Sequence, residues 1–123
     1  KYNNSQLEMY KQIVAAVKSE VLTKEDIKLI IPNGTAIQSA RTSYLGDTLT
    51  RDGFHLSLDI GRYIAGLTLV GCLTGLDLSE LTYMPAGVDE AVRSVAVESA
   101  KNALADPFDF SFSEYEEKPG AGA

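Results

Sequence analysis

Asp52 and His55 are the residues whose types and spacing could do chemistry together, and His55 is the only histidine in the 123-residue sequence. A histidine that is neutral near pH 7 can take a proton from a serine hydroxyl and later return it to a leaving group. A carboxylate bonded to the other ring nitrogen fixes the tautomer and stabilises the imidazolium. The spacing lets one turn bring both side chains together, and Gly53 gives that turn backbone freedom. The pair is therefore a candidate for two members of a hydrolase triad.

The third member of such a triad, a nucleophilic serine on a suitable turn, is not evident. The segment Gly46–Thr48 superficially echoes a Gly-Asp-Ser turn, but it carries threonine, follows no expected strand and lies just before Asp52. We interpret Ser57 as a cap of the next helix. Nothing in the sequence marks Ser39 or Ser43 as activated.

Composition and charge limit the class of protein. Hydrophobic residues make up 45% of the chain, which is enough for a core of one domain or part of one. The net charge of −6, without a basic run, argues against nucleic acid and anionic membranes as partners. The longest apolar stretch, Tyr63–Leu76, is too short for a bilayer, which needs about 20 residues. The chain starts without a hydrophobic signal segment.

Metals and cofactors are not expected. The single cysteine, Cys72, permits no internal disulfide and no cysteine-rich metal site. It lies in an apolar stretch, so we interpret it as an inert buried thiol.

Hydrophobic periodicity predicts helices that position these residues. The first is capped by Ser5, with Glu8 completing a capping box. The third is apolar almost all round, which is typical of a core helix, and its glycines indicate close packing by another element. Gly75 is its natural stop. The four expected helices are Ser5–Thr23, Thr35–Tyr44, Ser57–Thr74 and Val88–Ala105.

Two segments fit strands. Lys28–Pro32 is a short apolar run that favours a strand buried on both faces, as in a parallel sheet. Phe108–Phe112 alternates with period two, which fits a short edge strand or a loose tail equally well. We expect residues 116–123 to be a disordered tail. One confident strand cannot make a sheet, so the chain is either a helical domain or, as we favour, the C-terminal part of a larger α/β domain.

The sequence also resembles a known superfamily. Asp52–Ser57, continuing through Gly61–Gly66, resembles the closing motif block of SGNH (GDSL-type) hydrolases. Ile30–Ile37, with Arg41, is similar to the DUF4886-type proteins of gut Bacteroidetes. The resemblance covers roughly residues 5 to 105. It implies a flavodoxin-like three-layer α/β/α fold, with residues 1–115 as its C-terminal portion.

The resemblance implies an esterase in which His55 is the general base and Asp52 its orienting partner. The substrate would be an acyl ester of a small molecule or a glycan, and the setting secreted or periplasmic. The serine and the oxyanion-hole residues of that pattern lie upstream of the motifs found here, so this chain alone is expected to be inactive. We expect it to associate with a missing N-terminal half or with a second copy.

Three questions stay open at this point. Arg41 could line a cleft or form a surface ion pair. The same fold could be a non-catalytic module that binds a glycan or another small molecule. A helical interaction domain, in which Leu29–Ile31 is not a strand, is a third possibility.

Overall fold

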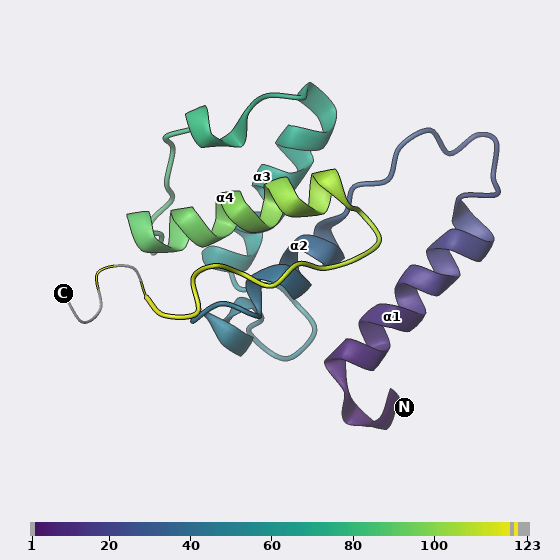
Figure 1. Ribbon diagram of the computed structural model, residues 1–123, viewed down its shortest axis with the longest axis horizontal. Coiled ribbons are helices and arrows are strands. Elements are labelled where there is room, and N and C mark those ends of the chain that lie inside the picture. The colour runs from purple at the N-terminus through teal and green to yellow at the C-terminus, as the bar shows by residue number, and fades with distance from the viewer. Residues whose placement is uncertain (1, 119, 121–123) are drawn as a thin grey trace. The chain divides into compact units, whose positions relative to one another are not determined.

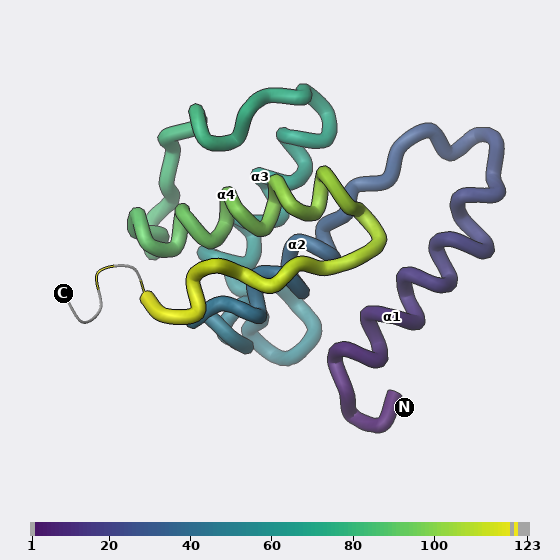
Figure 2. Tube along the Cα trace, in the orientation of Figure 1, coloured from purple at the N-terminus to yellow at the C-terminus, as the bar shows by residue number. Residues whose placement is uncertain are grey.

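The computed structural model describes residues 2–118 and 120, which fall into two units, Lys1–Ile30 and Ile31–Ala123. Four α-helices are the main elements of the described residues (Figures 1 and 2). The first unit holds α1 (Gln6–Ala16), and the second holds α2 (Asn33–Ala40), α3 (Ile60–Thr74) and α4 (Glu90–Ala105). All four predicted helices are therefore present. Each is shorter than predicted, and α2 also begins two residues earlier, at Asn33.

In the first unit, Ser5 begins α1 as predicted. Its Oγ accepts a hydrogen bond from the Glu8 backbone N–H at 3.2 Å. The return bond of a capping box is absent, because the Ser5 N–H donates to the Tyr2 carbonyl and the Glu8 carboxylate accepts from Gln12 at 2.9 Å. The helix continues as a π-helical stretch, η2 (Val17–Val21), which accounts for the longer helix expected from the sequence.

The strand predicted over Lys28–Pro32 is wrong. These residues have no regular secondary structure, and Leu29 and Ile31 are 50% and 36% exposed. A strand is held by hydrogen bonds to a neighbouring strand. Residues 2–118 and 120 offer none, since their sole β-type pairing is an isolated bridge between Thr50 and Leu56. The flavodoxin-like α/β/α fold predicted for this chain is therefore wrong as well: the described chain is helical.

The second unit is built from α2, α3 and α4, which pack on one another around a shared core. Figure 1 shows α4 crossing in front of α3, with α2 below it in the view. Alanines at the crossings let the helix backbones approach closely, and a few larger side chains fill the remaining space. The fully buried alanines are Ala36, Ala40, Ala96, Ala100 and Ala103, and the largest fully buried apolar side chains are Leu49, Ile64, Leu78 and Val95.

Side chains define the helix ends. The Asp89 carboxylate begins α4 by accepting from the Val92 N–H at 2.8 Å, a bond that lowers the pKa of Asp89. At the start of α3, Asp59 is the N-cap and its carboxylate accepts from the Ile60 N–H at 2.6 Å. Ser57, predicted as the cap, lies two residues earlier and supports the first turn, where its Oγ accepts from the Gly61 N–H at 2.8 Å. Gly75 ends α3 with a φ of +69°, as predicted.

The C-terminal segment that follows α4 runs back past α2 without forming a strand (Figure 2). The Ser111 N–H donates to Ser39 Oγ at 3.0 Å, and the Ser113 N–H donates to Thr42 Oγ1 at 2.8 Å. Side-chain hydroxyls of α2 and its C-terminal turn thus take the place of a sheet ladder. Of the two alternatives for this segment, the edge strand is absent.

The expected disordered tail over residues 116–123 stays a prediction. Residues 119 and 121–123 of that tail lie outside the described residues.

Candidate functional site

The predicted base and its partner lie on a short loop between the 3₁₀ helix η3 (Gly46–Leu49) and α3. The loop closes at its base, where the Ser57 N–H donates to the Leu49 carbonyl at 2.8 Å. One step further out, the Arg51 N–H donates to the His55 carbonyl at 3.0 Å. These backbone bonds form a stem, and residues 51–55 form an exposed tip.

Asp52 and His55 are in direct contact at this tip. His55 Nδ1 lies 2.6 Å from Asp52 Oδ2. The other carboxylate oxygen, Oδ1, accepts from the backbone N–H groups of Phe54 at 2.9 Å and His55 at 2.7 Å. Gly53 has a φ of +85°, which only glycine adopts without strain. The prediction that one tight turn joins the two side chains is confirmed.

The hydrogen bonds at the tip determine the charge of Asp52 and the tautomer of a neutral His55. The backbone N–H of His55, followed by the His55 imidazole, holds the pKa of Asp52 well below its usual range. Asp52 is therefore a carboxylate at neutral pH and can only accept, so Nδ1 carries the proton of a neutral His55. Nε2 is then the basic nitrogen, on a side chain that is 66% exposed. This arrangement can take a proton from a group placed against it.

The stem is anchored in the core. Leu49 is fully buried, and a Cβ placed on Gly61 would lie only 2.4 Å from its carbonyl oxygen. The first turn of α3 therefore packs directly against the backbone of the stem. The exposed tip rests on a base that has little freedom to move.

The structure does not bring a serine of this chain to His55. Ser57 Oγ is bonded to Gly61, and Ser43 Oγ donates to the Ala40 carbonyl at 2.6 Å. Ser39 Oγ accepts from the C-terminal segment. Each of the three serines considered in the sequence is thus used in holding the fold.

Arg41 forms an ion pair, which decides between its two alternatives. Its Nε and Nη2 lie 2.7 Å and 2.6 Å from Asp47 Oδ1, and its Nη1 donates to Gln38 Oε1 at 3.0 Å. The pair ties η3 to α2. Asp47 belongs to the segment that echoes Gly-Asp-Ser, and this contact gives it a structural role.

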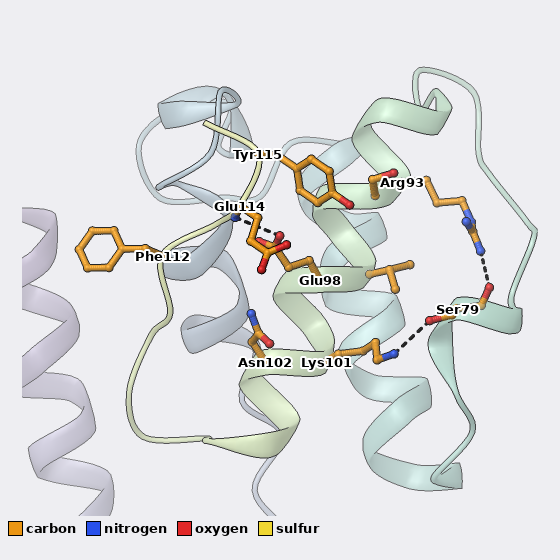
Figure 3. Close-up of a pocket in the computed structure, with 10 residues that line it drawn as sticks. Ser79, Arg93, Glu98, Lys101, Asn102, Phe112, Glu114 and Tyr115 are labelled. Atoms are coloured by element: carbon orange, nitrogen blue, oxygen red, sulfur yellow. Dashed lines mark hydrogen bonds between the residues drawn. The ribbon is translucent and has the colours of Figure 1, made fainter. Parts of the chain in front are cut away.

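A shallow groove on α4, which the sequence did not reveal, lies apart from this loop (Figure 3). Three of its four charged side chains are hydrogen-bonded within the chain. Arg93 donates to the Ser79 carbonyl at 2.8 Å, and Lys101 donates to Ser79 Oγ at 3.0 Å. Glu98 accepts from the Glu114 N–H at 3.1 Å. These hydrogen bonds hold α4 against neighbouring segments. No sequence motif marks them, because they join residues distant in the chain.

Metal ligands and membrane spans were also sought. Within residues 2–118 and 120, no three His, Cys, Asp or Glu side chains gather as a metal site. No helix in the same described part is both long and apolar enough to span a bilayer. Cys72 is half-buried in α3.

Comparison with known proteins places the chain in a family but not in a functional class. No curated protein matches it. A solved structure, that of a DUF4886 family protein from Bacteroides uniformis, is similar at 44% sequence identity with a TM-score of 0.84. The match covers 89% of this chain and 42% of that protein, so the chain spans less than half of its relative's length.

The comparisons give no link to SGNH hydrolases and no support for a hydrolase or esterase, and the described chain is helical, so the classification as an SGNH-type α/β protein is corrected. The resemblance to DUF4886-type proteins is confirmed. The family described as "Domain of unknown function (DUF4886)" matches residues 1–105. The chain therefore belongs to the DUF4886 family.

Proposed function

We propose that this chain supplies the general base and its orienting carboxylate to a serine esterase whose nucleophile lies outside the chain. The observation that carries the proposal is the 2.6 Å contact between His55 Nδ1 and Asp52 Oδ2, made by a carboxylate that two backbone N–H groups also hold. Such a carboxylate orients the imidazole and stabilises its charged form.

The reaction would follow the usual course of acyl transfer. A serine hydroxyl gives its proton to His55 Nε2 while its oxygen attacks the acyl carbon. The imidazolium, stabilised by Asp52, returns the proton to the leaving alcohol, and an acyl-enzyme forms. Water then attacks this ester as His55 takes its proton, and the acid departs with the serine restored. The substrate class is an acyl ester.

A binding module is the second candidate. Phe54 precedes His55 and is 89% exposed, and an aromatic ring presented in this way can stack on the apolar face of a sugar. In this case Asp52 would serve to hold the loop, and His55 would contact the glycan without transferring a proton.

A chimera tests the esterase, with this chain replacing the matching 42% of the Bacteroides uniformis protein. We expect the chimera to hydrolyse 4-nitrophenyl acetate or acetylated sugars above the background of free imidazole. His55→Ala should lower kcat/KM by about 10³-fold or more, and Asp52→Asn by a smaller but large factor. Asp109→Asn, an exposed carboxylate away from the loop, is the matched control and should leave kcat/KM unchanged.

The isolated chain should show only the imidazole background. An active chimera whose His55→Ala variant keeps full activity would contradict the proposed base. A folded chimera that binds acetylated sugars without hydrolysing them would favour the binding module instead.

A further inference from the structure

The two faces of α3 differ in what covers them. One face packs into the core through Tyr63, Ile64, Leu67 and Thr68, all of which are buried. The opposite side, which we call the open face of α3, consists of Ala65, Gly66, Leu69, Val70 and Leu73. These residues recur at spacings of three and four, so they share one side of the helix.

The open face is apolar, and solvent reaches it. Leu69 is 39% exposed and Leu73 is 61% exposed. Arg62, the one charged residue of α3, is exposed and lies four residues before Gly66 on this same side, so the open face is apolar beyond the first turn of the helix. A helix that is hydrophobic all round is normally buried all round, whereas a surface helix carries polar side chains on its outer face. The sequence prediction of a core helix is thus met on one side only.

The glycines of α3 show the same difference between the two faces. A Cβ on Gly61 would meet the Leu49 carbonyl oxygen at 2.4 Å, and one on Gly71 would meet the Leu104 side chain at 2.5 Å. Close packing therefore accounts for these two glycines. Gly66 has nothing within 4 Å of its Cβ position, although a glycine inside a helix is unfavourable by about 1 kcal/mol relative to alanine. Gly66 lies on the open face.

We propose that the open face of α3 is an interface, and that it is covered by the part of the longer family polypeptide that this chain does not include. The match spans 42% of the Bacteroides uniformis protein, so more than half of that polypeptide is available as the partner. The partner surface is apolar where it covers Leu69, Val70 and Leu73, leaves Arg62 at the edge of the contact, and approaches the helix backbone closely at Gly66. This inference rests on helix packing and is independent of the proposed chemistry at His55.

Co-expression tests the interface directly. The probe is the part of the Bacteroides uniformis protein outside the matched region, produced with this chain carrying an affinity tag. We expect it to copurify with the wild-type chain in a 1:1 complex. Leu69→Lys combined with Leu73→Lys should lower recovery at least tenfold. Phe112→Lys is the matched control, because it changes an even more exposed apolar side chain on the C-terminal segment, and it should copurify as the wild type does.

A second variant separates the interface from the fold. Gly66→Leu adds a side chain where this chain has open space, so circular dichroism should show an intact helical fold while copurification is lost. The proposal is overturned if the wild-type chain recovers no partner, or if both open-face variants recover as much as the control. It is also overturned if the chain alone forms a dimer in light scattering that the lysine pair disrupts, since a second copy would then be the occupant.

Discussion

Two long helices of the second unit, α3 and α4, carry their outer faces in opposite ways. The outer side of α4 is polar, and its Arg93, Glu98 and Lys101 are hydrogen-bonded to segments that follow α3 or α4. The outer side of α3 is apolar beyond Arg62, and the described residues show no such contacts there. Other segments of the same chain therefore satisfy the polar groups on the outer side of α4. On α3, the same chain covers the inner side only.

The largest expected effect is on the inner side of α3. Gly61→Ala should destabilise the chain by about 2 kcal/mol, because the new methyl group would overlap the Leu49 carbonyl and a backbone atom cannot move aside cheaply. This loss exceeds the gain in helix propensity of about 1 kcal/mol. Urea unfolding followed by circular dichroism measures it. A variant as stable as the wild type would show that the first turn of α3 does not rest on the stem.

A smaller effect of opposite sign is expected on the outer side. Gly66→Ala should stabilise the isolated chain by about 0.5–1 kcal/mol, because nothing lies near the added methyl group and alanine is the better helix former. The same urea experiment measures it, and Gly61→Ala is its matched counterpart. A loss of stability would mean that the outer side of α3 is already packed in the isolated chain. The outer sides of α3 and α4 would then not differ in being covered.

The smallest effect concerns the loop that leads into α3. The pKa of Asp52 is lowered in the folded loop, so the stability it contributes is present above the ordinary Asp pKa of about 3.9 and is lost only as pH falls through its lower folded value. Acid titration by NMR should therefore show the amide signals of Phe54 and His55 shifting below pH 3.9. An unstructured peptide of residues 50–57 is the reference. A midpoint equal to that of the peptide would contradict the ordered turn.

Local chemistry made part of the fold predictable. The cap at Ser5 and the stop at Gly75 depend on residues close in sequence, and both are confirmed. Ser57 does bond to the first turn of α3, but the cap itself is Asp59. The Asp52–His55 contact is local in the same sense, since both partners lie on one turn. Its catalytic role stays a prediction, because that depends on a nucleophile elsewhere.

The failures are those of long-range partners. Leu29–Ile31 has the composition of a buried strand, but a strand exists only where another strand pairs with it, and composition does not supply that neighbour. The contacts of α4 were missed for the same reason. Ser79 and Lys101 are separated by 22 positions, and nothing in the sequence pairs them.

The contacts of the C-terminal segment extend further along the chain than the family match does. The family match stops at residue 105, yet Ser111 and Ser113 are bonded to α2 and its C-terminal turn, and Tyr115 packs against the core. The Tyr115 carbonyl also accepts from the Tyr44 N–H at 2.9 Å. Cutting the chain at the family boundary would remove the hydrogen-bond donors to Ser39 and Thr42 and take the Tyr115 side chain away from the core. The contacts that hold the second unit thus extend past the family match, through Tyr115.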